Sequence, residues 1–276
     1  LKAEVAWLDA QQGVLQGWLG RLEALLARHW PELTRLMELS RVTVLRLLVH
    51  YGDPAQLAAD DQAARRLKRW GGKFLRIEKV QALIESARQT VGVRTDPASA
   101  ELIRRCAGQA LAATTELRAA ERRLLALARK DPQIRAEAQV VGIITACVLR
   151  ASVGDPANYH CGAAYRKAMG LNLKERSSGR HKGQLKLTKR GPSLARRWLY
   201  FAALRAVQRS SVRTWYEAKR RKDNQRGNKA VIAVMRKLAL AVYAVSAQGE
   251  TFSLARLLPG RPTPRSRPQP AGKPAD

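Results

Sequence analysis

Residues 174–198 read KERSSGRHKGQLKLTKRGPSLARRW, and this stretch decides what the second half of the chain builds. Gly179, Gly183 and Gly191 are spaced through its first part, which predicts a flexible basic loop. The pair Gly191-Pro192 fits a helix start, with proline at the first helical position, where a missing N–H costs nothing. The free N–H groups and the positive dipole end of such a helix favour phosphate.

Two hydroxyls, Ser177 and Ser178, open this loop. A serine hydroxyl in a cationic phosphate cradle is what nucleophilic attack on a phosphodiester needs. A loop that only holds nucleic-acid backbone, with its serines exposed or capping a turn, is the alternative. His181 is the nearest titratable side chain, as a general base or a phosphate contact. The candidate nucleic-acid-binding residues are Arg176, Arg180, Lys182, Lys186, Lys189, Arg190, Arg196, Arg197, Arg220, Arg221 and Arg226.

The net charge favours a polyanionic partner. The 276 residues carry 51 Lys and Arg against 22 Asp and Glu, a net charge of +29 with a pI near 11.2. A charge of this size points to nucleic acid. A basic protein of the membrane surface is the other option, but no lone amphipathic anchor and no membrane-spanning run supports it.

Three cysteines and four histidines are scattered without metal-ligand spacing. This pattern predicts a reducing, cytoplasmic location and no metal site.

Apolar residues at helical spacing predict an all-α chain. We expect an N-terminal helix over 1–30, a small helical unit over 31–95, a coiled coil over 96–130 and a small basic helical domain with the glycine-rich loop over 131–259. The Pro, Arg, Ser and Gly of residues 260–276 predict a disordered tail.

The tetrapeptide Gly-Asp-Pro-Ala occurs twice, at residues 52–55 and 154–157, each time after an apolar helical run. Glycine closes one helix and Asp-Pro opens the next, so we expect two similar helical hairpins. Such units resemble helix-hairpin-helix modules, which grip DNA backbone. A purely structural hairpin explains the pattern equally well.

A long helix starts at Asp96-Pro97 and ends at Lys130-Asp131. Its apolar residues alternate at spacings of three and four, which predicts a coiled-coil seam: Ile103, Cys106, Ala110, Ala113, Leu117, Ala120, Leu124 and Leu127. The partner is either the first helix of the same chain, folded back as a hairpin, or another protomer.

Three further features concern the surfaces. Residues 65–70 (RRLKRW) form a basic patch with an aromatic neighbour, either a solvated face or a nucleic-acid contact.

The segment 219–229 predicts an exposed basic linker, and the helix over 230–245 is apolar nearly all round and should be buried. The helix from Ser193 is expected to place on one side Leu194, Trp198, Phe201 and Leu204, with Arg205 next to this stripe.

Five short motifs stand in a specific order and spacing. They are Gly154-Asp155-Pro156, Met169-Gly170-Leu171, Ser177-Ser178-Gly179, Thr188-Lys189-Arg190-Gly191, and the closing segment from Arg226 to Leu238. Together they resemble the C-terminal transposase domain of the Piv/MooV family, the insertion-sequence 110/1111 transposases and related DNA invertases.

The resemblance implies a DNA-binding transposase or site-specific recombinase whose serine forms a transient phosphoserine link to DNA. It places that nucleophile at Ser178, with Ser177 as the second choice. It further implies an RuvC-like nuclease half, whose Asp-Glu-Asp-Asp carboxylates hold divalent metal such as Mg²⁺, and a guide RNA as partner.

No carboxylate constellation for such a metal is visible, and the chain begins at Leu1 within a helical pattern. We therefore expect a fragment without the nuclease half and without a cofactor of its own. A homo-oligomer formed through the coiled coil is a further expectation. The alternative function is a non-catalytic, basic helical protein that binds DNA or RNA.

Overall fold

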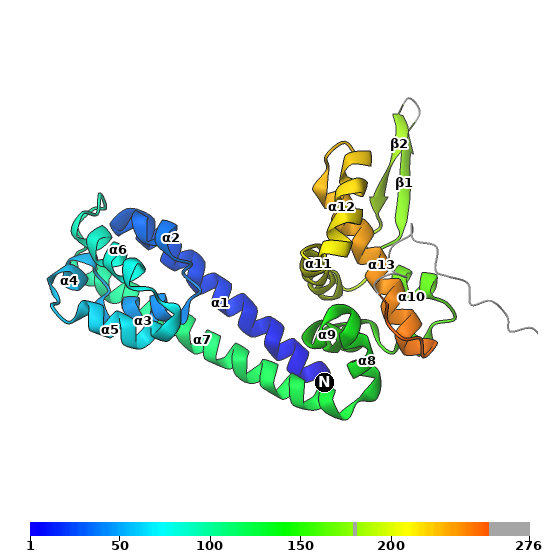
Figure 1. Cartoon of the computed structure of the whole chain (residues 1–276), viewed down its shortest axis with the longest axis horizontal. Coiled ribbons are helices and arrows are strands. Elements are labelled where there is room, and N and C mark those ends of the chain that lie inside the picture. Colours follow the sequence, from blue (N-terminus) through cyan, green and yellow to red (C-terminus); the bar gives the residue numbers. More distant parts are fainter. Residues whose placement is uncertain (179–180, 254–276) are drawn as a thin grey trace, which may run out of the picture. The chain divides into compact units, whose positions relative to one another are not determined.

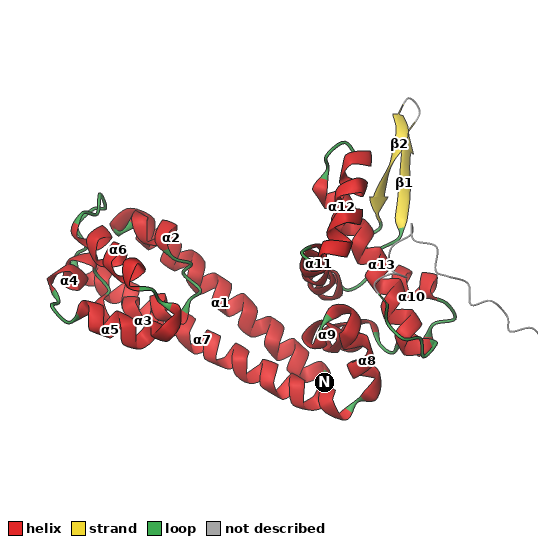
Figure 2. Cartoon of the chain, viewed as in Figure 1, coloured by secondary structure: helices red, strands yellow, loops and turns green. Residues whose placement is uncertain are grey.

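The computed structural model describes residues 1–178 and 181–253, and for residues 176–178, 181–185 and 210–211 it describes the backbone alone. Helices predominate (Figure 2), which confirms the all-α fold class. One antiparallel pair of strands, β1 (Leu173–Ser178) and β2 (His181–Leu187), departs from the expectation that the chain holds no strand. The chain divides into two compact units, with the boundary between Arg123 and Leu124.

The first unit is built on two long helices, α1 (Lys2–His29) and α7 (Pro97–Lys130), which lie side by side (Figure 1). Their direction is antiparallel, since Glu4 near the start of α1 accepts a hydrogen bond of 2.8 Å from Arg123 near the end of α7. Their buried side chains share one core, which includes Leu15, Leu22, Leu26, Ile103, Cys106, Ala107, Ala110 and Ala113. Of the two partners that the sequence left open, the first helix of the same chain is the one observed.

The predicted seam is largely the buried one. Small alanines in its middle allow α1 to approach α7 closely. Leu127 is 39% exposed, so the last position of the seam is wrong.

The shorter helices of the first unit follow one another between α1 and α7 (Figure 1): α2 (Pro31–Leu36), α3 (Val42–Tyr51), α4 (Pro54–Ala59), α5 (Ala63–Gly71), the 3-10 turn η1 (Gly72–Phe74) and α6 (Ile77–Arg88). Trp30 lies fully buried where α1 gives way to α2, and its indole N–H donates to Ser86 Oγ of α6. The helices α2 to α6 share the core of the long hairpin.

The first Gly-Asp-Pro-Ala segment joins two α-helices as expected, whereas the second opens only a 3-10 turn, so the two hairpins are less similar than expected. Gly52 ends α3 with a φ of 66°, and the Asp53 carboxylate caps α4 by accepting from the N–H of Ala55 at 3.0 Å. Gly154 ends α9 (Ile143–Val153) with a φ of 95°, and Asp155 caps a second 3-10 turn, η2 (Pro156–Asn158).

The first of these turns packs against protein. A Cβ atom at Gly52 would lie 2.6 Å from the carbonyl oxygen of Ala100 in α7. This contact favours the structural reading of the first copy over direct phosphate binding.

The second unit is organised around α13 (Gly227–Ala247), which packs against α8 (Pro132–Val141), α10 (Gly162–Ala168), α11 (Ser193–Val207) and α12 (Ser210–Lys222) (Figure 1). As expected, α13 is a core helix, with eight buried residues from Ala230 to Val245. Among the described residues α13 is also the single unbroken helix whose length and composition alone would suit a membrane span. Its packing inside this unit accounts for that apolar character.

Two expectations for this unit are wrong. The basic segment 219–229 is the last turn of α12, a short turn and the start of α13, and no linker. The buried face of α11 consists of Ala195, Leu199, Ala202, Ala203 and Ala206, because small side chains allow close approach to α9 and α13. Phe201 and Leu204 of the predicted stripe are 46% and 36% exposed.

The glycines of α1 provide a test of this packing. Space is open around Gly13, Gly17 and Gly20, where an added Cβ atom meets nothing within 4 Å. Gly17→Ala should therefore stabilise the chain by up to about 1 kcal/mol through helix propensity alone. Gly92→Ala is the matched opposite, since its Cβ atom would lie 2.2 Å from the carbonyl oxygen of His29. Chemical denaturation that shows both substitutions to be neutral would contradict the packing described here.

Candidate nucleic-acid interface

The stretch expected to be a flexible loop is a β-hairpin. Its register pairs Leu173 with Leu187 and Arg176 with Gln184, and then shifts before Ser178 pairs with His181. The sequence does hold a signal for the second strand, because Leu185 and Leu187 alternate with polar neighbours at the strand period. The three glycines and the high charge masked that alternation.

The proposed nucleophile ends the first strand. Ser178 is the last residue of β1, and its backbone pairs with that of His181, the first residue of β2. Ser177 falls at the register shift. Arg180 lies outside the described residues, and Arg176, Ser177, Ser178 and Lys182 are described by their backbone only. The contacts predicted for these five side chains stay predictions.

Two glycines join the base of the hairpin to the helices. Gly170 has a φ of 71°, and a Cβ atom there would lie 2.6 Å from the carbonyl oxygen of Arg190. A Cβ atom at Gly191, whose φ is 141°, would lie 2.2 Å from the carbonyl oxygen of Ala168. We call this close backbone approach the glycine clasp. It brings together two motifs of the predicted family pattern, Met169-Gly170-Leu171 and Thr188 to Gly191.

Hydrogen bonds hold the glycine clasp closed. The N–H of Lys189 donates to the carbonyl of Gly170 at 3.1 Å, and the N–H of Thr188 donates to the carbonyl of Asn172 at 2.8 Å. Arg196 donates from Nη1 to the carbonyls of Gly191, at 2.7 Å, and Met169, at 3.2 Å. The predicted phosphate ligand Arg196 therefore has a structural partner on each side of the clasp.

A basic cleft lies beside the glycine clasp. It has a volume of about 400 Å³, and its lining comes from the end of β2 and from α11 and α13: Leu187, Lys189, Arg196, Arg197, Tyr200, Asn228, Ile232 and Met235. Three of these residues are predicted nucleic-acid ligands. Asn228, in the first turn of α13, was missed because its place in the cleft depends on the tertiary packing.

The other predicted ligands are spread over the same unit. Lys186 and Arg190 are exposed near the end of the hairpin. Arg221 is exposed in the last turn of α12 and Arg226 is exposed just before α13, while Arg220 forms an ion pair of 3.2 Å with Glu217. The predicted start of α11 is shifted by one residue, since Pro192 itself is the N-cap, without a side-chain hydrogen bond to the helix.

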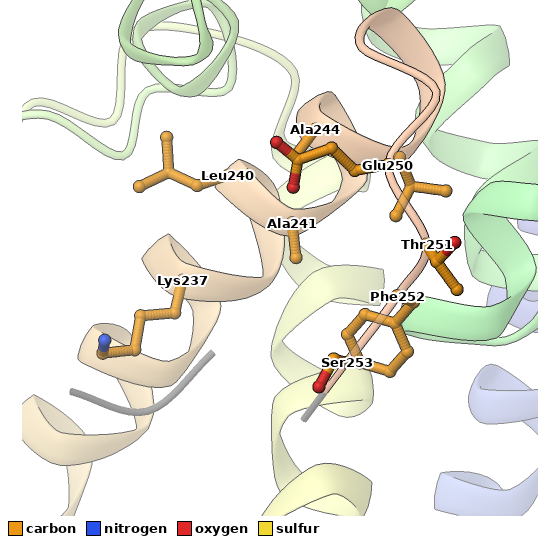
Figure 3. Close-up of a pocket in the computed structure, with 9 residues that line it drawn as sticks. Lys237, Leu240, Ala241, Ala244, Glu250, Thr251, Phe252 and Ser253 are labelled. Atoms are coloured by element: carbon orange, nitrogen blue, oxygen red, sulfur yellow. The ribbon is translucent and has the colours of Figure 1, made fainter. Parts of the chain in front are cut away.

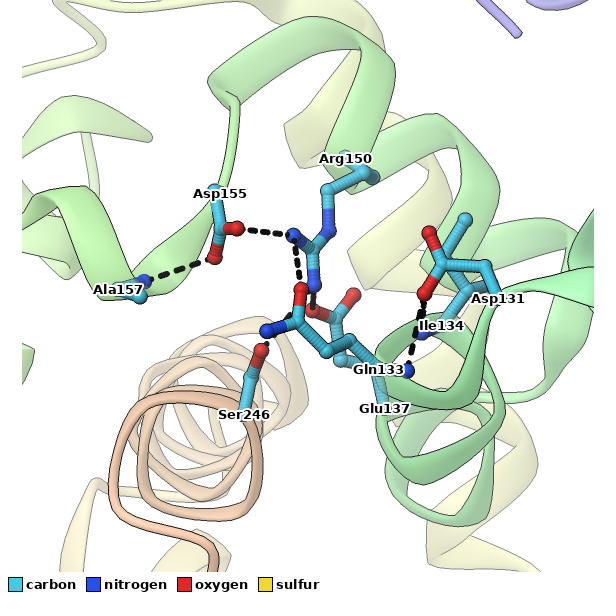
Figure 4. A network of polar contacts seen from close by, with 8 residues as sticks. All are labelled: Asp131, Gln133, Ile134, Glu137, Arg150, Asp155, Ala157 and Ser246. Atoms are coloured by element: carbon cyan, nitrogen blue, oxygen red, sulfur yellow. Dashed lines mark hydrogen bonds and ion pairs between the residues drawn. The ribbon is translucent and has the colours of Figure 1, made fainter.

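Behind the interface, a buried polar network ties α8, α9 and α13 together (Figure 4). Arg150 forms ion pairs with Glu137, at 2.5 Å, and with Asp155, at 2.7 Å, and it also donates to Gln133 and Ser246. Glu137 is fully buried, and this burial raises the pKa of its carboxyl although the Arg150 guanidinium opposes the rise. Asp155 of the Gly-Asp-Pro motif thus serves the scaffold.

A further hollow, of about 230 Å³, lies between the second half of α13 and residues 250–253 (Figure 3). Its floor is formed by Leu240, Ala241 and Ala244, with Lys237 at one end. It offers a single carboxylate, Glu250, and no cysteine or histidine. Throughout residues 1–178 and 181–253, no three His, Cys, Asp or Glu side chains gather as metal ligands.

The secondary basic patch belongs to the first unit. Arg65, Arg66, Lys68 and Arg69 are exposed on α5, and Phe74 in the turn that follows is 83% exposed, with the Lys73 ammonium 5.3 Å from its ring centroid. Cations beside an exposed ring are compatible with nucleic-acid contact. They are equally compatible with a solvated face.

A comparison with known families finds one match in this unit. Residues 133–220 match the model of the Transposase IS116/IS110/IS902 family. The match confirms the resemblance over α8 to α12, and it includes the hairpin, the glycine clasp and most of the basic cleft. A transposase domain of this family acts on DNA. A search among curated proteins finds no match for the chain.

The glycine clasp predicts a large effect of one methyl group. Gly191→Ala should cost at least about 2 kcal/mol, because overpacking against backbone adds to the strain of a positive φ. Gly154→Ala is the control, since its φ is also positive but open space surrounds its Cβ position, so it carries backbone strain of about 1–3 kcal/mol without overpacking and should lose less than Gly191→Ala. Equal losses in thermal unfolding would show that the clasp is not a close contact.

The Arg150 network predicts a pH-dependent stability defect. Arg150→Met leaves Glu137 buried without its cation, which should cost about 3–5 kcal/mol near neutral pH. A carboxyl with a raised pKa in the folded state loses stability as the pH rises through the unfolded pKa and beyond. The defect should therefore be smaller at pH 5 than at pH 8, as measured by denaturant unfolding at both values. The double substitution Arg150→Met with Glu137→Gln should remove most of this pH dependence, and an unchanged slope would count against the assignment.

Proposed function

We propose that this chain is the DNA-handling part of an insertion-sequence transposase, in which Ser178 attacks a DNA phosphodiester and forms a transient phosphoserine link. The observation that carries the proposal is the transposase-domain match over residues 133–220, which span the Ser-Gly hairpin. The basic cleft at the base of this hairpin supports it, because Lys189 and Arg197 supply positive charge for DNA phosphate.

In the proposed reaction, the Oγ atom of Ser178 forms a bond to phosphorus as the bond to one bridging oxygen of the DNA backbone breaks. The serine proton passes to a base or to water, and the departing oxygen of the cut strand takes up a proton. Attack by a strand end then reverses the exchange and releases the serine. His181 is a candidate for the base because its backbone pairs with that of Ser178.

The family resemblance implies Mg²⁺ held by Asp-Glu-Asp-Asp carboxylates. The residues that the structure describes do not form such a site. The described part of the chain contains no cluster of three potential ligands. We propose that the metal belongs to the RuvC-like nuclease half that the family resemblance implies.

Two further partners belong to the proposal. A guide RNA is proposed from the family resemblance, and the excess of cations over the second unit suits it as well as DNA. A homo-oligomer is proposed on surfaces other than the predicted seam of α7, since α1 covers that seam within the first unit.

The competing function is a basic helical protein that binds nucleic acid without chemistry. The exposed cations near the base of the hairpin and in α12 favour this function as much as they favour the transposase. It predicts salt-sensitive binding that ignores Ser178 and weakens when Lys186, Lys189 and Arg190 are all replaced by Gln.

The deciding experiment uses the complete transposase with the DNA ends of its own element. Ser178→Ala should remove the covalent protein–DNA adduct on denaturing gels and reduce strand exchange by at least about a thousandfold, as for other catalytic nucleophiles. DNA affinity should stay unchanged. Ser177→Ala is the matched control and should keep both activities.

Strand exchange at the wild-type rate by Ser178→Ala would overturn the assignment. Loss of the adduct in Ser177→Ala alone would transfer the role to Ser177. Absence of any adduct with the wild-type protein, together with salt-sensitive DNA binding, would favour the non-catalytic binder.

A further inference from the structure

Two arginines of the second unit meet without a counter-ion. The helices α10 and α13 pack so closely that a Cβ atom at Gly162 would lie 3.0 Å from Leu240 Cδ2 and 3.2 Å from Tyr243 Cδ1. Arg166 lies one turn after Gly162, and Arg236 lies one turn before Leu240. This register brings the two guanidinium groups to the same level of the helix pair.

Neither arginine has a partner for its charge. The Nε–H groups of both Arg166 and Arg236 are buried and donate no hydrogen bond to any described residue. Burial and the nearby Arg166 charge lower the pKa of Arg236. Two partly buried like charges destabilise a fold unless a counter-charge compensates them.

Four carboxylates of this unit pair with other cations. Glu137 and Asp155 pair with Arg150, Glu217 pairs with Arg220, and Asp223 pairs with Lys219. The sequences of α10, α11 and α13 contain no acidic residue. None of these four carboxylates compensates the two guanidinium groups, and an anion from outside the chain would neutralise them.

We propose that Arg166 and Arg236 form a phosphate-binding site for the backbone of a nucleic acid. Guanidinium groups suit phosphate because their planar N–H forks match its oxygens. The site adjoins the basic cleft, since Arg236 directly follows the cleft residue Met235 and lies one turn after Ile232. Bound strand that enters the cleft can thus reach both arginines. The choice of nucleic acid as the source of phosphate rests on the proposed function, whereas the anion site does not.

Removal of one guanidinium group should change stability and binding in opposite directions, with a higher melting temperature and a lower affinity for nucleic acid. Arg236→Met keeps the length of the side chain and removes its charge. In phosphate-free buffer, we expect the melting temperature of the chain to rise by a few degrees, since the repulsion with Arg166 is gone. Affinity for a 20-base-pair duplex should fall about tenfold at low salt, and the slope of log affinity against log salt should shrink by about 1.

The matched control is Arg135→Met, which removes an exposed arginine from α8 of the same unit. It should leave the melting temperature and the salt slope nearly unchanged. A lower melting temperature for Arg236→Met would show that the guanidinium is structural and would overturn the proposal. A salt slope equal to that of Arg135→Met would overturn it as well.

Titration with inorganic phosphate separates the two sources of the anion. A rise of the wild-type melting temperature that Arg236→Met lacks would assign the site to free phosphate as well as to the polymer. An effect confined to the duplex would assign it to the nucleic-acid backbone. Ser178→Ala should behave like wild type in all these measurements, so failure of the serine mechanism and failure of this site are distinguishable.

Discussion

The interface depends on the contact between two glycine backbones. A two-stranded hairpin is only marginally stable alone in water, so β1 and β2 need a fixed base. Gly170 and Gly191 provide it, because no side chain would allow the backbone before β1 to come so close to the backbone after β2. Arg196 then holds both sides of this contact from α11. The position of Ser178 at the far end of β1 therefore follows from a constraint at the near end.

Acidic and basic side chains are distributed differently in the second unit. The few acids of the second unit mostly serve internal pairs, as in the buried network of Arg150, Glu137 and Asp155 (Figure 4). Several of the remaining cations are exposed at the surface, among them Lys186, Lys189 and Arg190 after or within β2 and Arg221 in α12. Exposed like charges repel one another, and this cost is offset when a polyanion binds and releases its counter-ions. The distribution of acids, as much as the number of bases, thus defines the nucleic-acid face.

The sequence was most informative where local rules decide the structure. Asp96-Pro97 and Lys130-Asp131 marked the start and the end of the long helix correctly, and the aspartates of both Gly-Asp-Pro-Ala segments form caps, because capping depends on a few neighbouring residues. The family pattern was also visible in short motifs, and the match over residues 133–220 confirms it.

The sequence was least informative where packing decides. On α11 the stripe of large residues was expected to be buried, yet the alanine face packs inside, because close helix approach buries more contact than bulky side chains at a wider spacing. The hairpin was missed for a related reason, since glycine and charge suggest a loop unless a fixed base pairs the strands. Arg166 and Arg236 are 70 residues apart in sequence, and only the register of α10 on α13 brings them together.

These features together limit what the hairpin can do by itself. Its backbone presents Ser178 and His181 at one end, while the cations of the basic cleft lie at the other end, beside the glycine clasp. In the proposed reaction, the cleft therefore holds the DNA strand beside the reacting phosphodiester, and charge stabilisation at Ser178 comes from groups nearer the tip. The close contacts at the base, between Gly170 and Gly191, fit the proposed division into a base that holds the strand and a tip that reacts.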